Sequence, residues 1–352
     1  NADNLIGGED DDSFRAASLA VIQAGDSADG QGQSQGGVDT LDLQFAVNDA
    51  SSTLDTILGA NLHIFLRNAL TTENNVEFGG IGLNYAPGLD ELATGDGDDT
   101  LTLMRQGLSY ELNAGDDSIS LLALGAGNTT EVDGGAGYDE LYGSTGNDRL
   151  EIASVEYVDG NAGEDTVTMQ TPDAVQFWNV ETINGSFSAD NITADGNGID
   201  IVVNSNWGDD TVTVGSKSSV ANATVNASDE ADTIWVRATN NVFVNGDQGN
   251  VWDGDESIYA DANNVTVNGF GGNDTITVDT GLTATIDSGA GNDRVTLNDQ
   301  DQASTVNLGS GSDVFDYNGG SDDDLLTVTG GDGDDTISVD TWYHPGNVLS
   351  VS

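Results

Sequence analysis

Aspartate residues close a series of glycine-rich turns along this chain, and carboxylate oxygens are ligands that hard cations bind. Two well-formed copies are residues 267–278 (VNGFGGNDTITV) and 328–339 (VTGGDGDDTISV). Successive glycines permit positive φ angles, so backbone carbonyls can also point inward. The chemistry that these turns could perform is the binding of Ca²⁺, which takes about six to eight oxygen ligands.

We predict that several Ca²⁺ ions bind at the aspartates that close the turns. Stacked turns would place one carboxylate above the next, and like charges repel without a cation, so binding and folding should be linked. The turns that end at Asp190 and Asp232 lack the glycine two residues earlier, and we expect those sites to be empty. A plain solvated Asp-Gly turn is the alternative at every position. The candidate ligands are Asp99, Asp117, Asp139, Asp148, Asp165, Asp210, Asp274, Asp293, Asp313 and Asp335.

An Asn or Asp residue enters most of these turns. Side chains of this type often bond to the backbone two residues on, so we expect turn initiation or a stacked side-chain ladder, with metal ligation as the alternative. The residues are Asp133, Asp159, Asn184, Asn204, Asn226, Asn245, Asn268, Asp287 and Asn307.

The spacing of the turns points to the elements that hold them. They recur about every 20 residues, with a weaker copy centred on Glu256. Each step contains two short segments in which aliphatic residues alternate with threonine, as in 275–278 and 283–286, and this alternation is typical of strands. One such coil cannot bury its apolar face alone, whereas stacked coils can. The sequence predicts an all-β fold, a parallel β-solenoid of roughly a dozen coils over residues 93–352, with calcium turns along one edge and plain turns opposite.

Residues 1–92 match the repeat poorly. We expect degenerate coils and an N-terminal cap there, because an uncovered sheet edge invites association. A separate ligand-binding region in residues 1–92 is the alternative.

Composition narrows the function classes. The chain has 61 acidic residues against 7 Lys and Arg, a net charge of -54, which excludes nucleic acid and anionic membrane surfaces as partners. It has no cysteine, so disulfides and thiolate metal sites are impossible, and no apolar stretch long enough for membrane insertion. The two histidines, His63 and His344, stand far apart, and no Ser/His/Asp set is visible, so we predict that the chain is not an enzyme.

The turns resemble the calcium-binding nonapeptide of the RTX, or haemolysin-type, family, whose pattern is Gly-Gly-x-Gly-x-Asp-x-aliphatic-x. Residues 134–142 and 330–338 match every position. The resemblance implies a right-handed parallel β-helix or β-roll, type I secretion, and folding on calcium outside the cell. RTX rolls repeat the motif every nine residues, on both edges, whereas here only Asp139 and Asp148 show that step.

These observations predict a secreted, extracellular structural protein that binds calcium and self-associates, as a subunit of a surface layer, filament or biofilm matrix. The apolar segment 342–352, which reads as uncapped, would be the stacking end. An RTX-type adhesin or spacer module is the first alternative, and a polysaccharide-active β-helix enzyme is the second. A cell-surface polysaccharide is a candidate partner if tryptophans share a face. The tryptophans are Trp178, Trp207, Trp235, Trp252 and Trp342.

Overall fold

A computed structural model shows the chain as an all-β protein, and the described residues contain no helix. It describes residues 109–121, 129–215, 218–247, 254–298, 303–319 and 325–339, and elsewhere only the positions of strands. Within this described part there is no helical segment of the length and apolarity that crossing a membrane would need. The expected N-terminal cap and the expected uncapped segment 342–352 lie outside the described residues.

The chain forms two compact units, residues 1–170 (unit 1) and 171–352 (unit 2). Strands β1, β3 and β5 of unit 1 pair in parallel as a separate small sheet, while β2, β4, β6 and β8 pair in parallel with one another. The strands of unit 1 are β1 (Asn4–Ile6), β2 (Ser13–Ala16), β3 (Ser27–Asp29), β4 (Asp39–Leu43), β5 (Thr56–Leu58), β6 (Leu62–Leu66), β7 (Asn75–Phe78), β8 (Leu89–Ala93), β9 (Thr100–Leu103), β10 (Ser109–Glu111), β11 (Ser118–Leu121), β12 (Thr129–Asp133), β13 (Glu140–Tyr142), β14 (Arg149–Ala153), β15 (Tyr157–Asp159) and β16 (Thr166–Met169).

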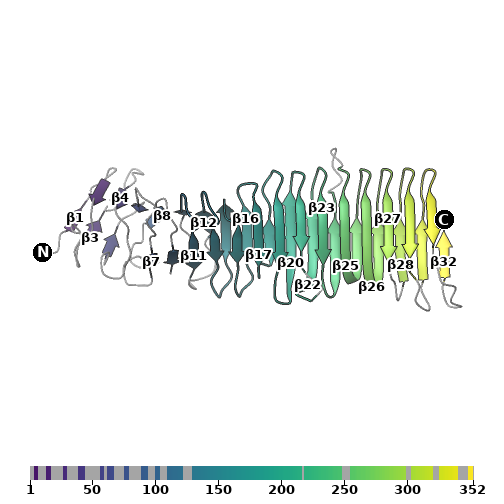
Figure 1. Ribbon diagram of the computed structural model, residues 1–352, viewed down its shortest axis with the longest axis horizontal. Coiled ribbons are helices and arrows are strands. Elements are labelled where there is room, and N and C mark those ends of the chain that lie inside the picture. Colours follow the sequence, from purple (N-terminus) through teal and green to yellow (C-terminus); the bar gives the residue numbers. More distant parts are fainter. Residues whose placement is uncertain are drawn as a thin grey trace. The chain divides into compact units, whose positions relative to one another are not determined.

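Unit 2 repeats one coil several times, with its strands side by side (Figure 1). Its strands are β17 (Ala174–Trp178), β18 (Thr182–Asn184), β19 (Asn191–Asp195), β20 (Ile199–Asn206), β21 (Thr211–Val214), β22 (Val220–Ala227), β23 (Thr233–Arg237), β24 (Asn241–Asn245), β25 (Ser257–Asn268), β26 (Thr275–Asp287), β27 (Arg294–Asn298), β28 (Ala303–Asn307), β29 (Val314–Asn318), β30 (Leu325–Thr329), β31 (Thr336–Val339) and β32 (Val348–Val351).

Alternate strands of unit 2 belong to two parallel sheets. One sheet contains β19, β21, β23 and the first half of β25, and the other contains β20, β22, β24 and its second half. β25 and β26 continue from one sheet to the other, with a register shift between Ala262 and Asn264. Across the residues described, the strands stack as a β-solenoid of about 10 turns, which confirms the predicted fold class.

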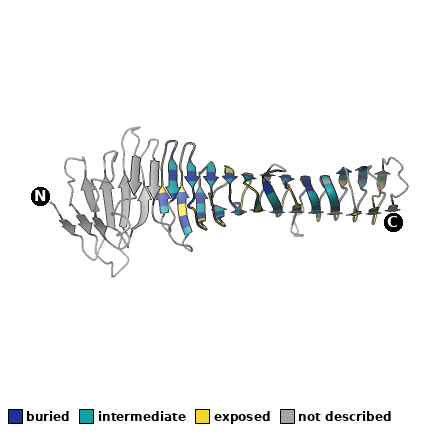
Figure 2. Cartoon of the chain, turned by 90° about the horizontal axis from the view of Figure 1, so that it is seen from below, coloured by how far each residue is buried: buried dark blue, intermediate teal, exposed yellow. Residues whose placement is uncertain are grey.

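The core is the column of aliphatic side chains between the two sheets. Along β23 burial alternates, with Ile234 and Val236 buried and Thr233 and Trp235 exposed, and Figure 2 shows this alternation along the described strands. The parallel register places similar residues above one another, so that Val212, Ile234 and Ile258 stack in one row. Each coil therefore buries its apolar face against its neighbours, as the sequence pattern predicts.

Glycines let the turns of successive coils in unit 2 touch one another. Gly311 has a φ of 141°, and a Cβ atom added there would overlap the carbonyl oxygen of Gly291, one coil earlier. Beside it, the Ser310 N–H donates to the Gly289 carbonyl and the Gly311 N–H to the Asp332 carbonyl, both at 2.8 Å. These glycines are required by the close stacking of the coils as well as by their backbone conformation.

We expect Gly311→Ala to lower the free energy of unfolding by about 4 kcal/mol or more, because the methyl group both strains a positive φ and separates two turns. Gly198 is the matched control, since its φ is 77° and an added Cβ would meet no atom within 4 Å. Gly198→Ala should lose about 1 to 2 kcal/mol through backbone strain alone. Equal losses in urea unfolding followed by circular dichroism would contradict the stacking role of Gly311.

Candidate metal-binding turns

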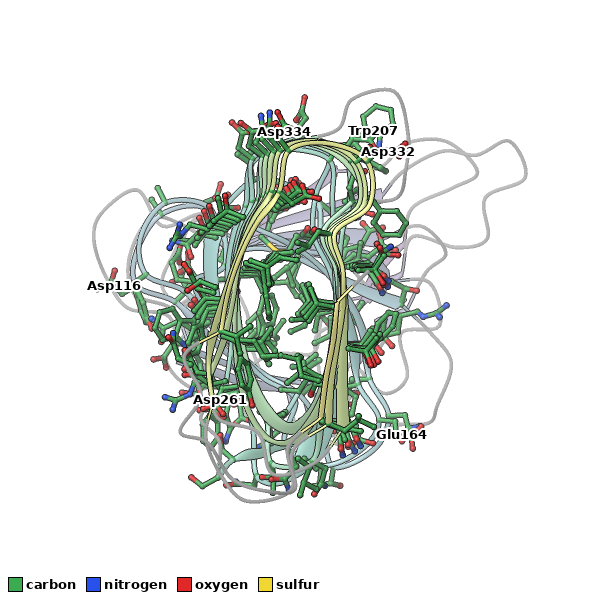
Figure 3. The ribbon with its side chains drawn as sticks, turned by 90° about the vertical axis from the view of Figure 1, so that its right-hand side faces the viewer. Asp116, Glu164, Trp207, Asp261, Asp332 and Asp334 are labelled. Atoms are coloured by element: carbon green, nitrogen blue, oxygen red, sulfur yellow. The ribbon has the colours of Figure 1, made fainter. Side chains whose placement is uncertain are left out.

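The acids that close the turns of unit 2 form a column, which we call the acid ladder. The backbone N–H of each acid donates to the Oδ1 atom of the acid one coil later, at 2.8 to 3.1 Å, in two runs, Asp190 to Asp232 and Glu256 to Asp335. Viewed along the coils, Figure 3 places Asp332 and Asp334 at this turn end of the coil and Asp261 toward the opposite end. The members of the acid ladder are Asp190, Asp210, Asp232, Glu256, Asp274, Asp293, Asp313 and Asp335.

Most ladder carboxyls leave one oxygen buried without a hydrogen-bond partner. The side chains from Asp210 to Asp313 are 1% exposed, and each Oδ1 atom that accepts a backbone N–H has an Oδ2 atom beside it that accepts nothing. A buried, unpartnered carboxylate oxygen is costly unless a proton or a cation neutralises it. The atoms without a partner are Oδ2 of Asp210, Asp232, Asp274, Asp293 and Asp313 and both Oε atoms of Glu256.

Burial makes these carboxyls weak acids. Desolvation is the main cause, opposed by the backbone hydrogen bond, and it raises the pKa of Asp210 to about 7, of Asp232 to about 8 and of Asp293 to about 6. Desolvation and the neighbouring Asp274 carboxyl raise the pKa of Glu256 strongly, and the pKa of Asp274 is raised as well. In the absence of cations, part of the acid ladder therefore holds protons at neutral pH.

Unit 1 carries buried acids along both edges, whereas the acid ladder of unit 2 follows one edge. The regular placement of these turns on one edge, as the sequence predicts it, is therefore wrong for unit 1. The chain passes from β12 to β13 through Asp139 and returns from β13 to β14 through Asp148, and these strands pair in different sheets. Asp148 bonds to Asp165 on that second edge, 17 residues on, through its N–H at 2.8 Å. The prediction of a single series of turns, in which Asp165 would follow Asp139 after one coil, is therefore wrong here.

The true neighbour of Asp139 in unit 1 is Glu156, which sequence reasoning missed. The Asp139 N–H donates to Glu156 Oε2 at 2.7 Å, and the Asp117 N–H donates to Asp139 Oδ1 at 2.8 Å. Asp139 is 1% exposed, its Oδ2 atom has no hydrogen-bond partner, and desolvation raises its pKa to about 7. In unit 2, Asp173 lies one coil before Asp190, because its carbonyl accepts the N–H of Asn191, the residue after Asp190. The sequence analysis did not identify Asp173 either. The signal was present, because 139, 156, 173 and 190 are evenly spaced by 17.

Two turns satisfy their acid with serine. Ser144 donates its N–H to Asp148 Oδ2 at 2.6 Å and its hydroxyl to Oδ1 at 3.0 Å. Ser186 makes the same pair of bonds to Asp190. Both oxygens of these carboxyls already accept hydrogen bonds within the protein, which distinguishes Asp148 from Asp210, Asp274, Asp293 and Asp313.

The residues of the acid ladder fit a calcium ion in donor type and burial. Carboxylate oxygens are hard ligands of the kind that Ca²⁺ prefers, and a bound cation would neutralise the negative charge that these unpartnered oxygens bury. The described residues contain no group of three or more acidic or histidine side chains converging on one point, and the carbonyls of Phe270, Gly289 and Gly309 already accept N–H bonds from the next turn. Any bound Ca²⁺ would therefore take its ligands from acids of successive coils, from backbone carbonyls other than these three, and from water.

The residues that enter the turns have the expected structural roles. In unit 2 the Asn Nδ2 groups donate to the Oδ1 of the Asn one coil earlier at 2.8 to 2.9 Å, from Asn268 back to Asn184, and Asn307 donates to Asp287 at 3.0 Å. In unit 1, Asp133 and Asp159 instead accept the N–H two residues on. Both the ladder and the turn-initiation interpretations are thus confirmed.

We expect Asn226→Ala to lower the free energy of unfolding by about 2 kcal/mol, because it leaves a half-buried donor and a half-buried acceptor without partners. Asn222→Ala on the same strand is the control, since its ladder bonds to Asp200 and Asn241 are exposed and water can replace them. That variant should lose about 0.5 kcal/mol. A similar loss in both variants on urea unfolding would argue against a stabilising role for the inner ladder.

The other expected features fall into two groups. Asp99, His63, His344, Trp252 and Trp342 lie outside the described residues. Of the remaining tryptophans, Trp207 stands in the turn before Asp210 and packs against Phe187, with ring centroids 6.2 Å apart, whereas Trp235 stands on β23. Trp207 and Trp235 therefore do not lie on one common face.

A scan against models of known protein families finds no match for this chain, and a search of curated proteins finds no similar sequence. Membership of the RTX family stays a prediction from the turn pattern. The function has to be argued from the acid ladder and the repeated coil.

Proposed function

We propose that this chain is a secreted structural protein that binds several Ca²⁺ ions along its solenoid and self-associates in the extracellular space, as a subunit of a surface layer, filament or matrix. The column of buried carboxylate oxygens without partners carries this proposal. In that column of unit 2, Asp210, Asp274, Asp293 and Asp313 are the residues that would hold the ions. Within unit 1, Asp139 has the same kind of unpartnered oxygen and would hold an ion in the same way. A bound cation supplies positive charge between carboxyls that otherwise repel one another.

The distribution of polar side chains supports a structural role. In unit 2 the described acids and asparagines bond from coil to coil in the same way at successive repeats, and this arrangement strengthens a stack. A catalytic centre instead brings several different groups to one place. The proposal therefore assigns the chain no catalytic role.

Charge links calcium to self-association. At a net charge of -54, copies of the chain repel one another, and added Na⁺ or K⁺ only screens this repulsion. Divalent ions bound along the acid ladder would reduce the charge itself. Association should therefore require Ca²⁺ itself, and a monovalent salt at the same ionic strength should not replace it.

Electron microscopy and light scattering of the purified chain test this proposal. In millimolar CaCl₂ we expect ordered assemblies that disappear with excess EDTA, whereas NaCl at equal ionic strength should leave the chain dispersed. Monodisperse monomers in millimolar calcium would contradict self-association. Failure of equilibrium dialysis to detect bound calcium would contradict the metal part separately.

A further inference from the structure

Two aromatic side chains stack on the outer face of one sheet in unit 2. Trp235 of β23 and Tyr259 of β25 are register partners on adjacent strands, and their rings lie 4.2 Å apart at an interplanar angle of 28°. Adjacent strands are about 4.8 Å apart, so the rings stand beside each other along the axis of the stack. Trp235 remains 48% exposed although one face of its indole is covered by Tyr259.

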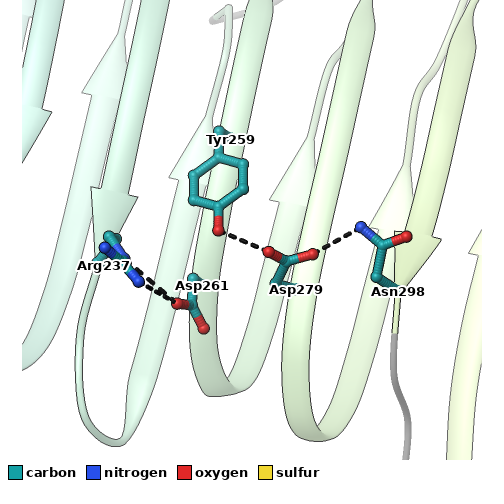
Figure 4. Close-up of polar contacts among 5 residues, drawn as sticks. All are labelled: Arg237, Tyr259, Asp261, Asp279 and Asn298. Carbon is teal, nitrogen blue, oxygen red and sulfur yellow. Dashed lines mark hydrogen bonds and ion pairs between the residues drawn. The ribbon is translucent and has the colours of Figure 1, made fainter.

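Polar contacts hold Tyr259, the second ring of this pair, in place (Figure 4). The Tyr259 hydroxyl donates to Asp279 Oδ2 at 2.6 Å, and Asn298 donates to the other oxygen of Asp279 at 2.6 Å. Next to them Arg237 donates to Asp261 through Nε and Nη2 at 3.2 and 3.1 Å. The ring of Tyr259 is thus anchored, and it supports Trp235 from one side in a fixed orientation.

The second face of the Trp235 indole is directed toward the preceding coils. Its register partner there is Thr213 of β21, and Thr193 of β19 lies one coil further back. Threonine is too short to cover an indole ring. Trp235 and Tyr259 thus form an aromatic wall on the outer face of the sheet, and Thr213 and Thr193 form a floor beside it that carries hydroxyl groups. A row of planar polar side chains, Arg237, Asp261 and Asp279, runs beside it in register.

We propose that Trp235 and the adjoining threonine floor bind a pyranose ring of a neutral polysaccharide. The axial C–H groups of a pyranose carry partial positive charge and pack well on the negative face of an indole. Its equatorial hydroxyls would meet the hydroxyl groups of Thr213 and Thr193 below. Because the wall is anchored in advance, little side-chain entropy is lost on binding.

Charge and size select this ligand class. The chain carries a net charge of -54 and Asp261 and Asp279 lie beside the wall, so an anionic glycan or a nucleic acid would be repelled. A protein partner needs about 800 Å² of contact on each side, usually around a buried apolar centre. On the β21 side of Trp235 the register neighbours are the half-buried Thr213 and the exposed Thr193, whose hydroxyl groups suit those of a sugar better.

The test is binding of the full chain, in millimolar calcium, to hydroxyethyl cellulose, a soluble 1,3-β-glucan and a galactomannan, with alginate as the anionic comparison. Affinity electrophoresis and tryptophan fluorescence report binding, and circular dichroism checks the fold of each variant. We expect saturable binding of at least one neutral polymer, a loss of affinity of about tenfold or more in Trp235→Ala, and no binding of alginate. Tyr259→Phe, which keeps the ring but loses the bond to Asp279, should weaken binding by a smaller factor.

Trp207→Ala is the matched control, because it removes an exposed tryptophan from a turn of the same unit, and it should bind like the wild type. Three results would overturn the inference: no neutral polymer binds, Trp235→Ala binds as well as the wild type, or Trp207→Ala loses as much affinity. This inference goes beyond the proposed structural role. A chain that stays monomeric in calcium can still bind glycan through Trp235, so the two failures are distinguishable.

Discussion

Millimolar Ca²⁺ is expected to raise the thermal unfolding midpoint of the metal-free chain at pH 8 by about 10 °C or more. A ligand at 100 times its dissociation constant adds about 2.7 kcal/mol for each site, and several sites add together. At this pH Asp210 and Asp293, with pKa values of about 7 and about 6, are mostly ionised, so the repulsion between neighbouring carboxylates is large and a cation has much charge to neutralise. Differential scanning calorimetry in EDTA and in CaCl₂ measures the difference.

A pair of aspartate variants separates specific binding from a general ionic effect. Asp293 closes a glycine-rich turn and is a candidate ligand, whereas Asp232 closes a turn without that glycine. Both are 1% exposed ladder members with an unpartnered Oδ2 atom. Asp293→Asn should lose a measurable part of the calcium response, and Asp232→Asn should keep all of it. An equal response in both variants, or an equal effect of MgCl₂, would show that the ions act through screening alone.

Without metal, the chain should be most stable near pH 4 to 5 and should lose several kcal/mol of unfolding free energy as the pH rises to about 8. The fold raises the pKa of ladder carboxyls above the ordinary 3.8, to about 7 for Asp210 and about 8 for Asp232. The native state therefore binds more protons than the unfolded chain between these values, so stability falls as the pH rises through that window and levels off above it. A pKa difference of one corresponds to about 1.4 kcal/mol.

Urea unfolding of the EDTA-treated chain at successive pH values measures this dependence. Asp232→Asn should be more stable than the wild type at pH 8 and similar to it at pH 4, because the substitution removes a charge that only the higher pH creates. Glu131→Gln is the control at an exposed acid, and its pH profile should follow that of the wild type. Stability that rises from pH 5 to pH 8 in EDTA would contradict the buried acid ladder.

The sequence was sufficient to predict the solenoid because each coil repeats the same local rules. Alternation of threonine and aliphatic residues, as at residues 275–278, specifies a strand with one buried face, and the Asp-Gly turns specify where the chain reverses. Stacking then follows, because only neighbouring coils can cover the buried faces. The Asn ladder was predicted on the same basis, from one residue type recurring at one place in the coil.

The edge on which each acid lies could not be predicted from the type of turn alone. Asp139, Asp148 and Asp165 carry similar turn sequences, yet coil length decides which sheet the next strand joins. In unit 1 the coil from Asp117 to Asp139 is 22 residues long and the coil from Asp139 to Glu156 is 17, so the position of the next acid cannot be found from one fixed spacing. The Gly-x-Asp pattern could not identify Glu156, because this turn has serine in place of the glycine and glutamate in place of the aspartate.

The stacking of Trp235 on Tyr259 also could not be predicted from the sequence. These residues are 24 apart, and only the coil-to-coil register shows that they are direct neighbours. The same holds for the unpartnered carboxylate oxygens, which are a property of how successive turns close on one another. When coils differ in length, the packing of the whole stack decides which residues become neighbours, so these contacts belong to the tertiary structure.

Anomalous diffraction from crystals grown in CaCl₂ tests the central claim most directly, because it locates the cations themselves. The account predicts anomalous peaks about 2.3 to 2.6 Å from the Oδ2 atoms of Asp274, Asp293 and Asp313, at successive turns of unit 2. Crystals that diffract well and show no anomalous peak beside any of these three carboxyls would contradict it.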